Sequence, residues 1–419
     1  MSGIRKFLVL FVLGGCAFLL SKAMIDMFLV PEPPPYGGNA TARLILTVSY
    51  LSVAITLVSH FRQALFVVRR NWFLLVLVFL AFVSCLWAES PGQVLQRSVA
   101  VLGTTLLGIA LAVRLSLEEQ LHLLRWIFRA MGILSLVCVL FFPNYGISHS
   151  LESLGDWQGI FGYKNMLGAM MALSILTEWH LPAVSLYARF TKWLAMLLSA
   201  VLLIFSNSIT PLVAIIVALF LIEIYKFAHQ RVRMPLYAIF LAGLLVMGCS
   251  SALLTSYTSA VGRSSNLSGR TEIWQIVLSR ISERPVVGWG YSGFWYGSSQ
   301  ESFAAEQAIG TIIMYSHNGY LEILLSLGAL GFLLALAFLG AGMKRAYYWS
   351  EIDRSSVNHW PLAFLLFFMI YNLGECTILL QDLQWALCVS VVASTDTALF
   401  VSGTEHEEES IYLPAHETA

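Results

Sequence analysis

Charged side chains are scarce in this chain. Only 11% of the 419 residues are Asp, Glu, Lys or Arg, whereas 58% are hydrophobic, and the mean hydropathy is +0.76. A soluble domain of this size would need far more charge to cover its surface. The few charges also balance, with 24 basic and 24 acidic residues, so no nucleic-acid partner is indicated. The composition therefore predicts an all-α polytopic membrane protein.

Cysteine is scarce as well, and its positions exclude two kinds of site. The six cysteines lie in or beside apolar runs rather than in polar loops. This placement indicates neither a disulfide framework nor a metal site, and we expect no cofactor. Leu13–Cys16 faintly resembles a lipoprotein cleavage box, but the apolar run continues past Cys16. An uncleaved first span is the better interpretation.

Long apolar runs are abundant and predict about 12 transmembrane helices. The runs are Phe7–Leu29, Ala42–Ser59, Trp72–Trp87, Val94–Val113, Leu123–Phe142, Asn165–Trp179, Phe190–Phe205, Pro211–Phe227, Pro235–Leu254, Asn318–Ala341, Pro361–Leu373 and Ile378–Phe400. One polar turn, Ser206–Thr210, is so short that one span more or fewer stays open.

Basic residues recur on alternate short connections, which predicts the orientation. If the N-terminus is cytoplasmic, most lysines and arginines fall inside, and the short outer connections hold only Arg43, Arg97 and Lys164. We therefore expect both termini in the cytoplasm and His317 on the outer side. The expected parts are nine helices in 1–254, a large periplasmic loop in 255–316, three helices in 317–400 and a disordered acidic cytoplasmic tail in 401–419.

The large loop contains a predicted amphipathic helix that starts near Thr271 and stops before Pro285. Arg270 stands at its start. Free backbone amides and the helix dipole favour an anion there, and a guanidinium adds donors matched to phosphate oxygens. Arg270 is thus the best candidate phosphate ligand. The alternative is an arginine that reaches to the lipid headgroups.

Residues 315–322, YSHNGYLE, place a titratable group at the start of a predicted span. The spacing of His317 from Gly328 and Gly331 predicts that the three residues lie on one face of a single helix. The histidine is then a catalytic residue at the end of that helix, and the glycines allow a neighbouring helix to pack closely. The alternative is an ordinary interfacial histidine above ordinary membrane-helix glycines.

Residues 285–296, PVVGWGYSGFWY, contain a GxGxxG pattern. No strand and helix flank it, so a nucleotide site is excluded. Trp289 and Tyr291 are instead candidates to present ring faces to a sugar, with an interfacial aromatic belt as the alternative. Near residue 160, Lys164 and Asn165 occupy the first turn of an outward helix end, a second place for an anion.

Ionisable residues within the predicted spans are few, and all can be placed near an interface. They are Asp26, Arg97, Glu375 and Asp382. A proton-driven transporter needs such groups deep in the bilayer, so this class is disfavoured.

His317-Asn318 followed by Gly328 and Gly331 resembles the signature of the O-antigen ligase and polymerase superfamily, bacterial membrane glycosyltransferases that act on lipid-linked glycans. The resemblance extends to Gly269-Arg270 with Trp274, to 285–291 with Phe294, and to 159–168. Together these motifs are most similar to the exopolysaccharide-polymerase branch.

The resemblance implies a bacterial inner-membrane protein of about a dozen helices. It also implies metal-independent glycan transfer from undecaprenyl diphosphate to an acceptor hydroxyl, with inversion, for which a polysaccharide acceptor, membrane lipid and a polysaccharide assembly complex are the expected partners. The implied roles are general base for His317, orientation of acceptor or base for Glu375, diphosphate binding for Arg270, Lys164 and Arg263, and acceptor or sugar binding for Asn165, Asn318, Trp289 and Tyr291. Glu375 is equally interpretable as a plain interfacial carboxylate.

One departure from the family pattern concerns the turn Ser206–Thr210, where many ligases carry an arginine of the diphosphate site and this chain has none.

Three other functions stay open: a ligase that moves a finished glycan to a lipid A core or a protein, a lipid-linked-glycan flippase or exporter, and a non-catalytic scaffold of an assembly complex.

Overall fold

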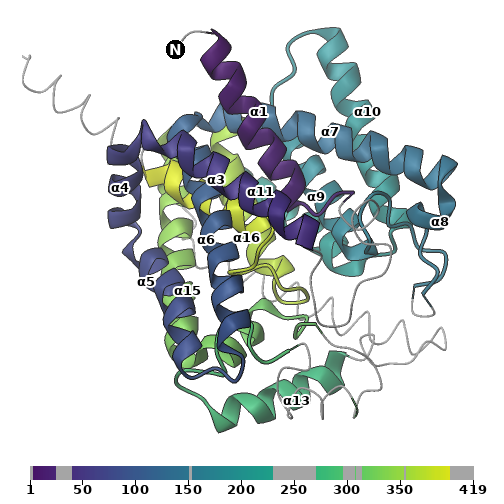
Figure 1. Ribbon diagram of the computed structural model, residues 1–419. Coiled ribbons are helices and arrows are strands. Elements are labelled where there is room, and N and C mark those ends of the chain that lie inside the picture. Colours follow the sequence, from purple (N-terminus) through teal and green to yellow (C-terminus); the bar gives the residue numbers. More distant parts are fainter. Residues whose placement is uncertain are drawn as a thin grey trace, which may run out of the picture.

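The computed structural model describes residues 3–24, 40–150, 153–229, 270–295, 307, 314–352 and 355–396. These residues form an all-α assembly (Figure 1), and the only extended pairing among them is an isolated bridge between Ile147 and Trp157. The helices are α1 (Gly3–Leu20), α3 (Ala40–Val58), α4 (Phe61–Arg70), α5 (Trp72–Val83), η1 (Ser84–Leu86), α6 (Pro91–Arg114), α7 (Leu117–Phe141), α8 (Pro143–Gly146), α9 (Lys164–His180), α10 (Leu186–Phe205), α11 (Ile209–His229), α13 (Arg270–Glu283), α15 (Gly319–Ile352) and α16 (Ser356–Tyr371). Residues 383–396 form a further helix.

Seven of the described helices are long and apolar enough to cross a membrane, and α4 with α5, bent by 90°, could form an eighth span. The protein is thus a multi-pass membrane protein of the all-α class, as the composition predicts. Each apolar run found in the sequence coincides with a helix, except 235–254, which lies outside the described residues together with most of the large loop and the acidic tail.

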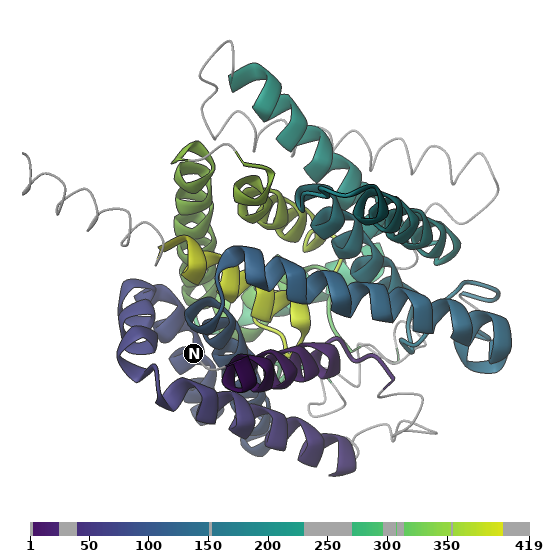
Figure 2. The same ribbon diagram turned by 90° about the horizontal axis from the view of Figure 1, so that it is seen from above.

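The helices differ in how much of their surface is buried. α16 and residues 383–396 are buried almost throughout, and the latter lie near the middle of the assembly seen from above, with α1 and α3 at the periphery (Figure 2). In α3 and α10 only 17% of the apolar window is buried. A helix that is apolar all round suits a protein core, whereas an exposed apolar helix suits contact with lipid.

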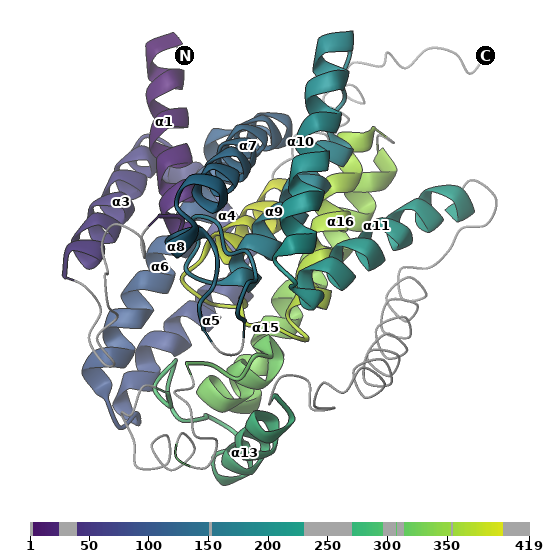
Figure 3. The same cartoon turned by 90° about the vertical axis from the view of Figure 1, so that its right-hand side faces the viewer.

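α13 lies across the end of the assembly opposite to that from which α1 and α10 project (Figures 1 and 3). The amphipathic helix expected here is confirmed. Its residues Ile273 and Val277 are buried in a small apolar cluster with Trp289 and Leu325. The apolar face of α13 therefore packs on α15 and on the chain that follows α13.

α15 is interrupted at Gly328, whose φ of 62° and ψ of −164° are not helical. This region of backbone space is essentially restricted to glycine. A Cβ atom here would lie 2.3 Å from the carbonyl carbon and oxygen of Val286. Gly328 is therefore required because another stretch of backbone, residues 285–290, passes directly against it.

That stretch replaces the hydrogen bonds that the interruption removes from α15. In an unbroken helix the N–H groups of residues 329 and 330 would bond to the carbonyls of 325 and 326. Here all four groups bond to the inserted stretch instead. The four bonds run from Trp289 N–H to Leu325 O (2.9 Å), Gly290 N–H to Ser326 O (2.9 Å), Ala329 N–H to Pro285 O (2.8 Å) and Leu330 N–H to Val286 O (3.2 Å). These four backbone groups of α15 therefore stay paired despite the break.

The prediction that His317, Gly328 and Gly331 share one stripe of one helix is wrong. His317 precedes α15 and has a left-handed φ of 52°, and the helix breaks before Gly331. A Cβ at Gly331 would meet Leu327 of its own helix at 2.3 Å. The glycines therefore accommodate the inserted stretch and the resulting kink, rather than a neighbouring helix.

Candidate functional site

The candidate site is centred on Glu375, in the turn that joins α16 to the helix at 383–396. Asn372 shapes this turn, because its side-chain oxygen accepts bonds from the N–H groups of Thr377 (2.8 Å) and Ile378 (3.0 Å). The turn leaves the Glu375 side chain only 5% exposed. A carboxylate this buried needs partners to offset its lost hydration.

The start of α15 is fastened to the same turn. The N–H of Gly319 donates to the carbonyls of Asn372 (2.8 Å) and Glu375 (2.9 Å). Only glycine fits there, since a Cβ would lie 2.3 Å from the side-chain oxygen of Asn372. Asn318 caps the helix by accepting from the N–H of Tyr320 at 3.0 Å. These contacts bring His317, the preceding residue, to the edge of the turn.

His317 faces the carboxylate of Glu375, with 3.7 Å between Nδ1 and Oε2. This distance exceeds that of a hydrogen bond, and Nδ1 has no hydrogen-bond partner among the described residues. The side chain keeps 28% exposure. The ring of Tyr315 lies 4.5 Å from the imidazole, centroid to centroid, and burial, reinforced by the charge of Glu375, raises the pKa of the Tyr315 hydroxyl. A neutral phenol therefore borders the imidazole.

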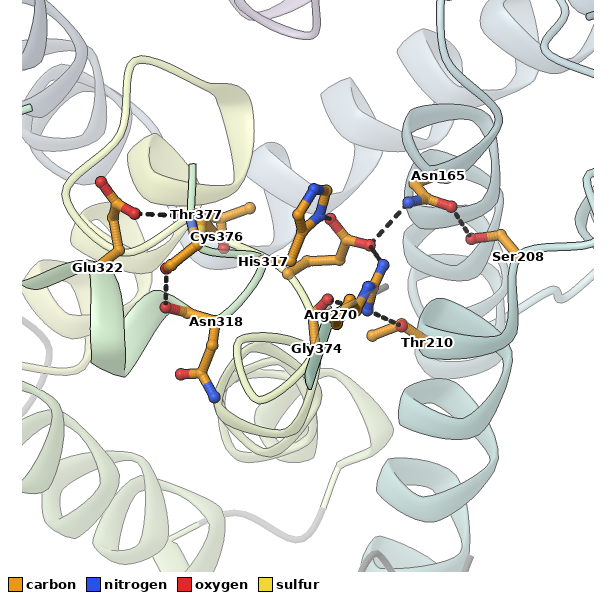
Figure 4. A network of polar contacts seen from close by, with 12 residues as sticks. Asn165, Ser208, Thr210, Arg270, His317, Asn318, Glu322, Gly374, Cys376 and Thr377 are labelled. Carbon is orange, nitrogen blue, oxygen red and sulfur yellow. Dashed lines mark hydrogen bonds and ion pairs between the residues drawn. The ribbon is translucent and has the colours of Figure 1, made fainter. Parts of the chain in front are cut away.

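Arg270, the first residue of α13, is the cationic partner of Glu375. Its Nη2 lies 2.6 Å from Oε1 of the carboxylate. Nη1 donates to the carbonyl of Gly374 and to Oγ1 of Thr210 at 3.4 Å. These contacts use only part of the five N–H groups of a guanidinium, and they hold Arg270 beside His317 around one carboxylate (Figure 4).

Asn165, in the first turn of α9, completes the ring of contacts. Its Nδ2 donates to Oε1 of Glu375 at 2.7 Å, and its Oδ1 accepts from the hydroxyl of Ser208 at 2.7 Å. In Figure 4 these two residues lie on the right, with His317 to their left. Five chain segments far apart in the sequence therefore meet at Glu375: α9, the turn before α11, α13, the start of α15 and the turn after α16.

Some predicted site residues lie elsewhere. Lys164 pairs with Asp156 at 2.7 Å and not with Glu375. Trp289 and Tyr291 are each 5% exposed. Trp289 donates from Nε1 to the carbonyl of Arg280 at 3.0 Å, and Tyr291 donates to the carbonyl of Leu379. These two rings are buried against other parts of the chain, so neither is part of the proposed site.

Asn318 and Arg263 were also predicted to belong to the site. The side chain of Asn318 bonds backbone groups of the turn and of α15, including the carbonyl of Leu373 at 3.2 Å. It lies beside the site as a cap. Arg263 lies outside the described residues.

Sequence reasoning missed Ser208 and Thr210. Ser208 belongs to the turn between α10 and α11, and Thr210 is the second residue of α11; an arginine was sought in this region and not found. The structure shows that this region supplies hydroxyl groups, one to Asn165 and one to Arg270. The signal was the run of small hydroxyl residues in a tight turn between two apolar segments.

Two comparisons show which known proteins this chain is similar to. Residues 194–336 match the family described as O-antigen ligase. The exopolysaccharide production protein ExoQ of Rhizobium meliloti (strain 1021) is 24% identical over 270 residues, which cover 61% of this chain and 60% of that protein. Both matches support the O-antigen ligase and polymerase superfamily as the family that this chain resembles. The part matched to O-antigen ligase contains Arg270 and His317, whereas Asn165 and Glu375 lie outside it.

Proposed function

We propose that this protein is a glycosyltransferase of the bacterial inner membrane that polymerises oligosaccharide repeats linked to undecaprenyl diphosphate into an exopolysaccharide. The observation that supports it is the convergence of His317 and Arg270 on the buried carboxylate of Glu375. A base, a cation and an orienting carboxylate are what transfer of a sugar from a diphosphate requires.

His317 is the general base. Free imidazole titrates far below a sugar hydroxyl, so the histidine takes the proton as the hydroxyl attacks the anomeric carbon. Glu375 faces Nδ1 at 3.7 Å, which leaves Nε2, on the other edge of the ring, for the acceptor. The carboxylate orients the ring and stabilises the imidazolium that forms. Such contacts commonly shorten once substrate is bound.

Arg270 stabilises the leaving group. As the acceptor oxygen bonds to the anomeric carbon, the bond from that carbon to the phosphate oxygen breaks, and undecaprenyl diphosphate departs with the electron pair. N–H groups of Arg270 that are not used by Gly374, Thr210 and Glu375 are directed to the negative charge that develops. Direct displacement inverts the anomeric configuration.

A ligase is the second candidate, since the family matched by residues 194–336 is described as O-antigen ligase. A ligase would transfer a finished glycan to a lipid A core or a protein with the same residues. The name of the relative, an exopolysaccharide production protein, favours the polymerase. The size of the lipid-linked glycan that accumulates in a deletion strain separates the two, because a polymerase leaves single repeats and a ligase leaves long chains.

The test of the catalytic role is His317→Ala. Loss of a general base lowers turnover by roughly 100- to 10,000-fold, so we expect no detectable polymer at an unchanged amount of protein in the membrane. Polymer is measured by gel electrophoresis after complementation of the deletion strain, and turnover with purified protein and lipid-linked donor. His122→Ala, at an exposed position on α7, is the control and retains activity. Full-length polymer from His317→Ala refutes the proposal.

A further inference from the structure

The backbone just before the proposed base is unusually constrained. His317 has a φ of 52°, a left-handed conformation that costs free energy for a residue with a side chain and persists only where the surroundings hold it. The preceding residue, Ser316, is completely buried. Contacts that fix Ser316 therefore also fix the direction in which the imidazole of His317 leaves the chain.

Every polar group of Ser316 has a partner. Its N–H donates to Oε2 of Glu322 at 2.8 Å, its carbonyl accepts from Nε1 of Trp274 at 2.9 Å, and its hydroxyl donates to the carbonyl of Asn318 at 2.9 Å. The third bond is local. The first two come from α15 and α13, so the peptide before His317 is held between two helices.

Glu322 is a buried carboxylate with neutral donors only. It is 6% exposed, and its oxygens accept from the N–H of Ser316 and from Nε1 of Trp295 at 3.1 Å. Among the described residues it forms no ion pair. Burying a carboxylate that no cation contacts directly is costly unless strong hydrogen bonds compensate. The charge of Arg97 acts on Glu322 without an ion pair, and one of the direct hydrogen bonds goes to the residue before the base.

Trp274 connects the base to the diphosphate ligand. It lies four residues after Arg270, and side chains at this spacing leave the same side of a helix. α13 thus carries both the guanidinium bound to Glu375 and the indole bound to Ser316. A shift of α13 would move the two together.

We propose that Trp274 and Glu322 are positioning residues that set the imidazole of His317 against Glu375 and Arg270 by clamping Ser316 from two sides. The inference rests on the proposed function, since it assumes that His317 is the base. Neither residue contacts the reacting atoms. The clamp fixes the distance over which the proton moves and the orientation of Nε2.

The primary test is Trp274→Phe, which removes the indole N–H and keeps an aromatic ring in the cluster. A misplaced base costs up to roughly 100-fold in rate, so we expect kcat to fall about 10- to 100-fold, with the KM for the lipid-linked donor unchanged. The pH profile of kcat shifts, because the environment of the imidazole changes. Trp193→Phe, at an exposed position on α10, is the control and keeps wild-type values.

A second measurement does not depend on turnover. The rate at which diethylpyrocarbonate modifies His317, followed by mass spectrometry of the membrane protein, reports the surroundings of the imidazole directly. We expect this rate to change in Trp274→Phe and in Glu322→Leu. Glu322→Gln keeps one acceptor oxygen for the N–H of Ser316, so we expect it to restore most of the kcat lost in Glu322→Leu.

The outcomes separate the two proposals. If His317→Ala is active, the proposed function fails. If His317→Ala is inactive, but both Trp274→Phe and Glu322→Leu keep the wild-type modification rate and pH profile at His317, the positioning role is refuted even where kcat has fallen. If either Trp274→Phe or Glu322→Leu does not reach the membrane in normal amount, the other variant decides the test. The modification rate is normalised to the amount of the peptide that contains His317.

Discussion

At the residue scale, the planar fork of Arg270 reaches three different acceptors. Its two terminal nitrogens contact a carbonyl and a carboxylate of the turn after α16, on Gly374 and Glu375, and a hydroxyl at the start of α11, on Thr210. A lysine keeps the positive charge but, with one ammonium on a flexible stem, cannot reproduce this geometry. The charge and the shape of Arg270 are therefore separable by mutation.

We predict that Arg270→Ala lowers turnover roughly 100- to 1,000-fold, as does loss of one stabilising donor at a developing anion. Arg270→Lys should lose much less, since it keeps the charge. Turnover with purified protein and lipid-linked donor measures both. Arg280→Ala, on the same helix and in an ion pair with Glu283 at 2.8 Å, should leave turnover unchanged. Equal activity of the alanine and lysine variants of Arg270 would contradict a phosphate role.

The residues of the site were partly predictable from the sequence. His317, Arg270, Glu375 and Asn165 were all candidates, and the structure brings them together. Lys164 was a candidate because, with Asn165, it occupies the first turn of an outward helix end, but adjacent residues on a helix point about 100° apart, and its partner is Asp156. Which of two adjacent residues faces the site depends on how the helix is rotated about its axis. The sequence pattern of a single apolar span does not determine that rotation.

At the element scale, the interruption of α15 connects the parts of the site. The stretch that follows α13 is inserted at Gly328, and His317 lies two residues before the first half of α15. α13 and α15 are therefore joined by backbone hydrogen bonds as well as by side-chain packing. Displacing the inserted stretch would move Arg270 relative to His317.

We predict that Gly328→Ala lowers both thermal stability and turnover. The new Cβ would lie 2.3 Å from Val286, and a non-glycine residue in this backbone region costs about 1–3 kcal/mol before any clash is added. The melting temperature in detergent and the turnover rate are the measurements.

Gly340→Ala is the matched control for that substitution. Gly340 lies in the same helix, and a Cβ there meets nothing within 4 Å. Alanine has the higher helix propensity, so this variant should be as stable as the wild type or slightly more so. A Gly328→Ala protein as stable as the Gly340→Ala protein would show that the inserted stretch does not require glycine.

The break itself could not be predicted from hydrophobicity. The apolar run continues from residue 323 to 340 without a polar residue other than Ser326. The hydrophobic pattern therefore predicts a single uninterrupted span. The interruption depends on a stretch some 40 residues earlier in the chain, whose backbone groups replace the missing bonds. A partner so far away in the sequence does not change the spacing of apolar residues within the helix.

At the scale of the whole molecule, the proposed function requires that the site face outward, and α9 offers a direct test. Asn165 of the site lies in its first turn, and its other end leads into the 181–185 connection. Leu154 is 69% exposed in the loop before α9, and Val184 is 90% exposed in the connection after it. The distribution of lysine and arginine predicts that the first loop lies outside and the second in the cytoplasm.

We predict that Leu154→Cys, in a protein whose native cysteines are replaced, reacts with a membrane-impermeant maleimide in right-side-out vesicles. Val184→Cys should react only after the vesicles are permeabilised. Because a single helix separates the two positions, each is the control for the other, and denatured protein gives the full extent of labelling. The reverse pattern would place Glu375 and its partners toward the cytoplasm. A lipid-linked glycan presented at the outer leaflet could not then reach His317, and the polymerase proposal would fail although the contacts around the carboxylate were intact.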